Sequence, residues 1–269
     1  MNKRAKTLVL VLLGSIFAVA ARGHDTWLLP EHTSVAPGTE VSLDLTSGMA
    51  FPLLEYPIKT DRVGRSVLRL AGKTAGITTR NIGTKSLQLR TRLGSPGIAT
   101  LGVSLEPKSI ELKPAEVAEY LDEIGAPEPL RRAWAGAKEP KRWREIYTKH
   151  AKTFIRVGEP GADRSWAEPL GLALEILPEK DPTTLKPGDE LAVRVLRKGR
   201  PVPQLSLGIV HGGHAQGALR MTDAEGRAVL RLDRAGLWLL RATDLRQSSR
   251  KDANWESDFA TLTLEVRRN

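Results

Sequence analysis

Seven short segments with strand character follow one another at nearly even spacing in the C-terminal part of this chain. Turn signals such as Lys186-Pro187-Gly188-Asp189 separate them. Many short strands at regular spacing predict an immunoglobulin-like or transthyretin-like β-sandwich, which we expect over residues 168–269. The seven expected strands are residues 170–177, 190–197, 204–210, 219–221, 227–232, 236–243 and 259–266.

Alternating apolar and polar runs also fill residues 27–112, where glycine and proline divide them. This pattern predicts a second sheet with one solvated face. The expected strands are residues 40–45, 66–71, 86–91 and 98–105.

The hydrophobic period then changes from two to between three and four. Val117, Leu121 and Ile124 lie between Pro114 and Gly125, which indicates an amphipathic helix. Further helices are expected over residues 128–135 and 141–151, before a returning strand over 152–157. The predicted fold is therefore mainly β, with two β-sandwich domains. The N-terminal domain would span residues 24–158 and carry a helical insertion at about 114–151.

The first 23 residues have the character of an export signal. A basic start precedes an apolar run over residues 8–21, which is shorter than the roughly 20 residues that a membrane-spanning helix needs. Small residues fit cleavage after Ala20, Ala21 or Gly23. We expect a periplasmic or secreted mature chain, and no second apolar stretch predicts a membrane span.

Composition narrows the possible chemistry. The chain has no cysteine, which excludes thiolate zinc sites, iron–sulfur clusters and cysteine nucleophiles. The formal net charge is +10, but the basic residues are spread along the chain, which argues against a nucleic-acid-binding groove. No serine-hydrolase elbow, phosphate-binding loop or His-Glu-x-x-His motif is present, so we expect no enzyme activity.

His24 follows the apolar segment directly and is the first candidate ligand. Cleavage after Gly23 would leave its α-amine and imidazole as two donors on one residue, both able to bind metal near neutral pH. Cleavage after Ala21 would instead allow square-planar copper(II) or nickel(II) binding by the first three residues. Cleavage after Ala20 favours a histidine that merely starts the first strand. Asp25 would orient the imidazole or remain a solvated charge.

His211-Gly212-Gly213-His214 forms a second candidate site between two expected strands. A two-residue Gly-Gly turn would place the two histidine Cα atoms about 4.5 to 5.5 Å apart, close enough to bind one ion. The alternative is a mobile loop tip with no ligand role. His150 is expected to serve packing or capping. The expected aromatic core residues are Trp27, Trp238 and Trp255.

Several short motifs, taken together in their order along the chain, resemble a bacterial family of exported proteins of unknown function that is often associated with nickel uptake and with cobalt and nickel transport. The motifs are His24-Asp25-Thr26-Trp27-Leu28-Leu29-Pro30, Ser109-Ile110-Glu111-Leu112, Glu119-Tyr120-Leu121, Tyr147-Thr148-Lys149-His150-Ala151-Lys152, Pro178, Asp181-Pro182, Pro187-Gly188-Asp189, Thr222-Asp223-Ala224-Glu225-Gly226 and Trp255-Glu256-Ser257.

The resemblance implies a periplasmic protein that binds nickel or cobalt and passes it to a membrane metal transporter or an outer-membrane receptor. It implies His24 as a ligand. Where relatives place a histidine after the Trp-containing strand, this chain has Asp244, which becomes a candidate oxygen ligand. Two alternatives stay open: a copper enzyme that oxidises polysaccharide through an N-terminal histidine, and an adhesive or scaffold module of the envelope.

Overall fold

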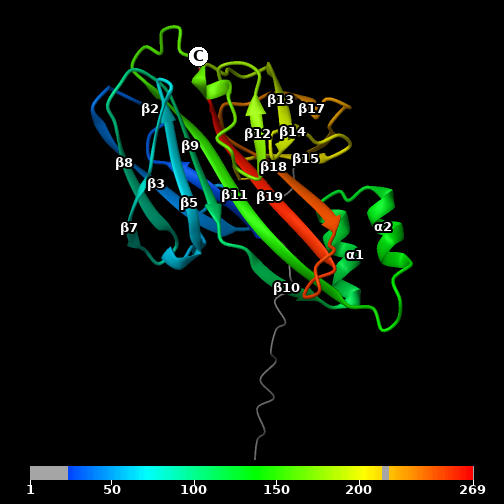
Figure 1. Ribbon diagram of the computed structural model, residues 1–269. Helices are drawn as coiled ribbons and strands as arrows, with labels where there is room; N and C mark the ends of the chain where they lie inside the picture. Colours follow the sequence, from blue (N-terminus) through cyan, green and yellow to red (C-terminus); the bar gives the residue numbers. More distant parts are fainter. Residues whose placement is uncertain (1–23, 214–217, 269) are drawn as a thin grey trace, which may run out of the picture.

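The computed structural model describes residues 24–213 and 218–268. Over these residues the strands form a five-stranded, a ten-stranded and a four-stranded sheet, which we call the first, central and third sheets. Figure 1 shows the long strands of the central sheet running through the middle of the molecule, with the helices at one end. The expected export signal, residues 1–23, lies outside the described residues.

The first sheet has the order β1-β3-β8-β7, and β4 pairs with β3. All its pairings are antiparallel. Its strands are β1 (Asp25–Pro30), β3 (Thr39–Gly48), β4 (Tyr56–Pro57), β7 (Thr78–Ile82) and β8 (Leu87–Leu93).

The central sheet has the order β16-β15-β18-β19-β11-β9-β5-β6, and β2 and β10 pair with β11. Its strands are β2 (Ser34–Val35), β5 (Val63–Leu70), β6 (Lys73–Ala75), β9 (Gly97–Leu105), β10 (Lys108–Leu112), β11 (Trp143–Val157), β15 (Ser206–His211), β16 (Ala218–Met221), β18 (Gly236–Gln247) and β19 (Trp255–Val266).

The third sheet has the order β12-β13-β14, and β17 pairs with β13. Its strands are β12 (Leu174–Pro178), β13 (Asp189–Arg197), β14 (Arg200–Pro201) and β17 (Arg227–Leu232).

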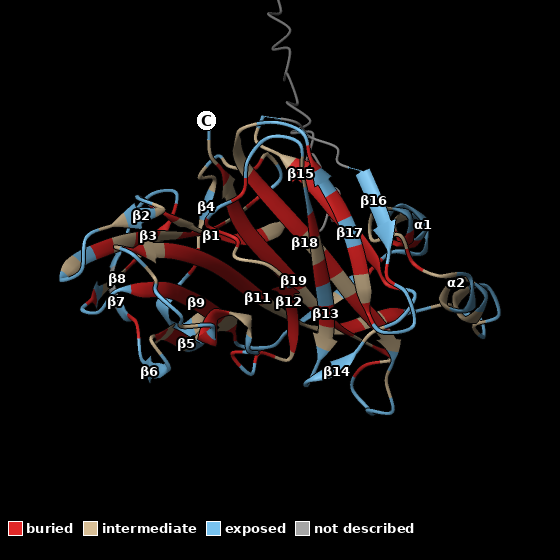
Figure 2. Ribbon diagram, turned by 90° about the horizontal axis from the view of Figure 1, so that it is seen from above, coloured by how far each residue is buried: buried red, intermediate tan, exposed pale blue. Residues whose placement is uncertain are grey.

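The first and third sheets cover opposite faces of the central sheet. Ile155 packs in the core under the first sheet, with Leu28 and Leu43. Its neighbour Phe154 packs in the core under the third sheet, with Val193 and other residues. Successive strand residues point to opposite faces, so two sandwiches share one sheet, and Figure 2 shows buried residues along its middle strands.

The join between the sandwiches is the parallel pairing of β11 with β19, which runs from Glu145 opposite Trp255 to Thr153 opposite Thr263. The fold class is as predicted: mainly β, with two sandwiches, helices inserted in the first and an immunoglobulin-like second. The same pairing makes the central sheet continuous through both sandwiches. The expected domain boundaries at residues 158 and 168 stay a prediction.

Two α-helices, α1 (Pro114–Glu123) and α2 (Glu128–Ala135), lie in the described part of the chain as expected. Pro114 starts α1, and the Glu116 carboxylate accepts a hydrogen bond of 2.8 Å from the backbone N–H of Lys113. Short 3₁₀ turns also occur at η1 (Thr60–Arg62) and η2 (Ser165–Ala167). Neither α-helix has the length and apolar character needed to cross a bilayer.

The expected helix over residues 141–151 is wrong, because residues 143–151 belong to β11. Trp143 and Glu145 are buried on the face that the helices cover, and β10 and β19 pair with this part of β11 on its two sides. Pairing on both edges overrides the local sequence preference. The returning strand over residues 152–157 is confirmed as the end of β11. Trp27, Trp238 and Trp255 are buried, as expected.

Candidate functional site

His24 directly precedes β1 and is held at two points. Its carbonyl oxygen accepts a hydrogen bond from Nζ of Lys149 on β11. Its ring packs against Tyr56 of β4, with ring centroids 5.2 Å apart and planes tilted by 47°. The residue is half-buried. These contacts fix the imidazole beside β4 and β11 rather than leaving it on a free end.

The pKa of His24 is lowered from its ordinary value, first because burial disfavours the imidazolium and then because of the Lys149 charge. The carboxylates of Glu55 and Asp25 act in the opposite direction, with smaller effects. The imidazole is therefore neutral at pH 7. A neutral imidazole has a nitrogen lone pair available to a metal ion.

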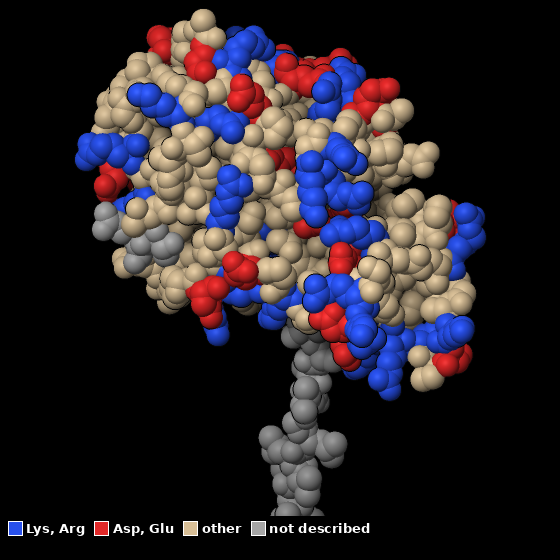
Figure 3. Space-filling model, viewed as in Figure 1, with Lys and Arg blue, Asp and Glu red and all other residues tan. Residues whose placement is uncertain are grey.

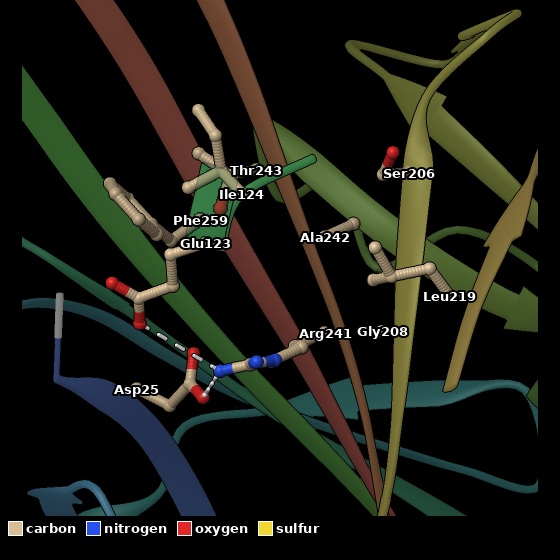
Figure 4. A pocket seen from close by; sticks show the side chains of 10 residues that line it. All are labelled: Asp25, Glu123, Ile124, Ser206, Gly208, Leu219, Arg241, Ala242, Thr243 and Phe259. Carbon is tan, nitrogen blue, oxygen red and sulfur yellow. Dashed lines mark hydrogen bonds and ion pairs between the residues drawn. The ribbon is translucent and has the colours of Figure 1, made fainter. Parts of the chain in front are cut away.

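Asp25 does not orient the imidazole, because its carboxylate is taken by Arg241 of β18. Oδ2 of Asp25 lies 2.8 Å from Nη1 of Arg241, and Oε1 of Glu123 lies 4.0 Å from the same nitrogen. Figure 4 shows the guanidinium between the two carboxylates. The enclosed space here is about 20 Å³, room for about one water molecule. This cluster ties β1 and α1 to the central sheet.

A larger hollow lies on the other side of Lys149, and we call it the basic crevice. Its volume is about 390 Å³. Its lining residues are Ser47, Pro57, Ile58, Lys59, Asp61, Arg62, Leu105, Lys108, Tyr147 and Lys149. His24 is not a lining residue, but its carbonyl oxygen contacts the lining residue Lys149, and its ring packs on Tyr56, which precedes the lining residue Pro57.

Lys149 is the innermost cation at this junction. Its Nζ lies 5.7 Å from the ring centre of Tyr147 and 5.8 Å from that of Phe259, so aromatic faces surround the ammonium group. Burial lowers the pKa of Lys149 to about 8, while the Asp25 charge raises it and the Arg62 charge lowers it. Sequence reasoning missed this residue, although the alternation Tyr147-Thr148-Lys149 in a strand sets it on the same face as Tyr147.

His211 lies on the opposite face of the central sheet from His24. Arg241 contacts Asp25, so its side chain is on the face covered by β1. Trp238 lies three residues away on β18 and therefore points to the other face. The His211 ring packs on Trp238, with centroids 4.8 Å apart, and its Nε2 lies 3.0 Å from the Ala235 carbonyl oxygen. One ion cannot bind both histidines in this arrangement.

The expected Gly-Gly hairpin turn is wrong. It would place Ile209 opposite residue 216, whereas Ile209 pairs with Ala218, so the connection between β15 and β16 is longer than two residues. His214 lies outside the described residues.

Asp244 is buried on the face away from β1 and is held by two arginines. Its Oδ2 lies 2.9 Å from Nη1 of Arg197 on β13 and 3.5 Å from Nη1 of Arg246. It also lies six residues from Trp238 along β18, a separation of about 20 Å. His24, His211 and Asp244 are thus not brought together, and the Asp244 carboxylate already has cationic partners.

His150 is buried, as a packing role requires, and it also links two polar groups. Its Nδ1 lies 2.8 Å from Oγ of Ser104, and its Nε2 lies 3.2 Å from Oδ1 of Asp258. The second carboxylate oxygen of Asp258 lies 2.8 Å from Nη1 of Arg246. These contacts connect β9, β11, β19 and β18 across the central sheet.

At His24 the described residues provide one candidate donor nitrogen rather than a complete metal site. Within residues 24–213 and 218–268 no group of three or more His, Asp or Glu side chains converges to hold an ion. The imidazole of His24 supplies one nitrogen, and its α-amine would supply a second if cleavage follows Gly23. The remaining positions would be left to oxygen donors from outside the chain.

A family described as a domain of unknown function, DUF4198, matches residues 21–244. The chain belongs to this family. The DUF4198 range begins just before His24 and ends at Asp244, so it includes the basic crevice and both described candidate histidines. No curated protein matches the chain.

Among solved structures, the chain resembles the adhesin InvE of Yersinia pseudotuberculosis, with 13% identity over 88% of this chain and 58% of the adhesin chain, at a TM-score of 0.24. It resembles a titin I-band fragment, I67–I69, with 9% identity over 91% of this chain and 66% of that chain, at 0.20. It resembles the D00-D0 domain of intimin, with 9% identity over 90% of this chain and 99% of that chain, at a TM-score of 0.21. The chain spans less than two thirds of the first two chains. Nothing about function follows from a likeness this loose.

Proposed function

We propose that this DUF4198 protein is an exported, non-enzymatic protein of the bacterial envelope that binds a divalent transition-metal ion, nickel or cobalt, at His24. The observation that carries the proposal is the placement of His24, with its carbonyl bonded to Lys149 and its ring packed on Tyr56. A residue fixed in this way loses less conformational freedom on binding than one on a free end.

The electrostatics of His24 support a ligand role. Its lowered pKa keeps the imidazole neutral, so no proton has to leave before the nitrogen binds a metal. Removal of residues 1–23 would add the α-amine and so give a chelating pair of nitrogen donors. Nickel and copper bind nitrogen donors well, whereas calcium and magnesium prefer oxygen. The amine–imidazole pair on His24 forms only if cleavage follows Gly23, whereas cleavage after Ala21 would place the imidazole third in a square-planar site.

The test uses the chain whose first residue is His24. Isothermal titration calorimetry measures its binding of nickel, cobalt and copper salts. We expect one site whose affinity falls by about tenfold or more in His24→Ala, because the imidazole is lost and the remaining α-amine can no longer chelate. His211→Ala is the matched control, because this histidine lies on the opposite sheet face. Acetylating the terminal amine separates its contribution from that of the imidazole.

Mass spectrometry of the exported protein establishes whether His24 is the natural first residue. Equal metal affinity in the wild type and in His24→Ala would contradict the proposal, as would a mature chain that begins well upstream. Either outcome would favour the adhesive-module alternative, which requires no metal.

A further inference from the structure

We propose that the basic crevice binds a small organic anion that carries two or more carboxylate groups. Four cationic side chains line the crevice, Lys59, Arg62, Lys108 and Lys149, against the single carboxylate of Asp61. With the lysines protonated, the formal charge of the lining is +3. Within the described ranges, none of the four cations forms an ion pair with a carboxylate.

The walls of the crevice strengthen this charge. Ile58 and Leu105 are buried apolar residues of the lining, and Pro57 and Tyr147 add further apolar surface. A concave site with low-dielectric walls focuses the field of its charges and attracts ions of opposite sign. An anion that enters would therefore meet an excess of positive charge over the single lining carboxylate of Asp61.

The size of the crevice limits the anion to a small molecule. Its volume of about 390 Å³ lies near the lower end of the usual range for small-molecule sites, about 300 to 1,000 Å³. On the face of the molecule drawn in Figure 3, acidic groups lie among the basic ones, and this face shows no continuous basic stripe of the kind that binds nucleic acid. The crevice thus suits a compact ligand with several negative groups rather than a nucleic acid.

Two of the cations lie on different elements, and each is held in place by a hydrogen bond. This arrangement favours an anion with a charged group at each end. Nη1 of Arg62, at η1, donates a 3.2 Å hydrogen bond to the Pro107 carbonyl oxygen, which leaves other N–H groups of its planar fork for a carboxylate. Nζ of Lys149, on β11, is positioned by the His24 carbonyl. A ligand with two carboxylates can meet both cations at once, whereas a single phosphate has one charged centre.

The anion site also deepens the proposed function, and this step rests on it. His24 contacts Lys149, which lines the crevice, and supplies at most two donors, so an ion bound there needs further ligands. Carboxylate oxygens of an anion in the crevice would provide them. The metal would then be captured together with its organic chelator.

The test begins without metal, with citrate as the probe and inorganic phosphate for comparison. Calorimetry at low ionic strength should show one citrate per chain. Affinity should fall by about tenfold or more in Arg62→Gln/Lys108→Gln, because two charge-assisted hydrogen bonds are lost. The double variant Lys73→Gln/Lys251→Gln is the matched control, because it removes the same charge from exposed positions outside the crevice. Circular dichroism checks that both variants are folded.

The proposal is overturned if citrate does not bind, if both double variants weaken citrate equally, or if phosphate binds the crevice more tightly than citrate. A second arm adds nickel. Citrate should strengthen nickel binding in the wild type but not in His24→Ala. Citrate binding without nickel binding would refute the metal site and leave the anion site standing. Nickel binding without citrate binding would refute the anion site and leave the metal site standing.

Discussion

The hydroxyl of Tyr120 donates a 3.0 Å hydrogen bond to Oε1 of Glu145 and so fastens α1 to the central sheet. The same buried carboxylate accepts hydrogen bonds from Nε1 of Trp143, at 2.8 Å, and from Oγ of Ser257. Donors from α1, β11 and β19 therefore converge on one carboxylate. The arrangement holds the helices beside the junction where Glu123, at the end of α1, meets Arg241.

Tyr120→Phe should destabilise the protein by about 1 to 3 kcal/mol, because it removes one donor from a buried carboxylate and keeps the ring packing. Urea unfolding followed by circular dichroism measures the change. Tyr56→Phe is the control, because Tyr56 is 55% exposed, and it should stay within about 0.5 kcal/mol of the wild type. Equal stability of the two variants would mean that the Tyr120 hydroxyl does not anchor α1.

The stability contributed by Glu145 should depend on pH in the direction opposite to that of most carboxylates. Burial raises its pKa above the ordinary value of 4.5, while hydrogen bonds from Ser257, Trp143 and Tyr120 lower it by less. A raised pKa means that the folded state holds the proton more tightly, so the contribution is full below pH 4.5 and is lost as pH rises through the folded pKa.

The stability of the wild type relative to Glu145→Gln should therefore increase as pH falls toward 4.5. Unfolding curves of both proteins at several pH values between 7 and 4 provide the measurement. A constant difference across that range would show that the carboxyl group titrates with the same pKa in both states.

The local elements were predictable, because alternation and turn residues act within a few positions. The strands from Asp189–Arg197 and Arg227–Leu232 follow such patterns, and so does α1 between Pro114 and Gly125. The long parallel pairing of β11 with β19 joins segments about a hundred residues apart, and no local pattern specifies it. The misassigned helix at residues 141–151 has the same cause, because its strand form depends on β10 and β19.

The candidate site was predictable only in part for a related reason. His24 is marked by its position after the apolar segment, and its contact with β4 and β11 depends on how β1 lies over the central sheet. The basic crevice gathers Lys59, Lys108 and Lys149 from three separate segments. In the sequence these residues are isolated charges. Sequence spacing also could not show that β18 turns Asp244 toward Arg197.

The buried pair Lys152 and Glu175 should show strong energetic coupling. Nζ of Lys152 lies 3.5 Å from Oε2 of Glu175, and both side chains are at most 3% exposed. Glu175→Gln would leave a buried ammonium group without its counter-charge, at a cost of about 3 to 5 kcal/mol at pH 7. Lys152→Met should cost less, because the carboxylate keeps hydrogen bonds from the backbone N–H groups of Leu170 and Leu172.

The cost of Glu175→Gln should shrink at alkaline pH. Burial lowers the pKa of Lys152 to about 8 from its ordinary value of 10.5, with the Glu175 charge acting in the opposite direction. The folded state thus releases the proton first, and stability rises with pH between about 8 and 10.5. A double-mutant cycle by urea unfolding at pH 7 and pH 9.5 measures both effects, and additive single costs would contradict the coupling.

Gly226 should tolerate alanine far less well than Gly188, although both glycines have positive φ angles in turns. Gly226 has φ +70°, and a Cβ there would lie 2.7 Å from the Val195 carbonyl oxygen and 2.9 Å from the Val202 nitrogen. Gly188 has φ +93°, and its Cβ would meet no atom within 4 Å. Gly188→Ala should therefore cost about 1 to 2 kcal/mol for the left-handed backbone alone. Gly226→Ala adds a clash with backbone that cannot move without opening the pairing of β13, so its cost should exceed that of Gly188→Ala by about 1 kcal/mol or more. Thermal unfolding of the two variants measures the difference in stability. An equal loss of stability in both would mean that the turn at Gly226 can accommodate a Cβ without a clash.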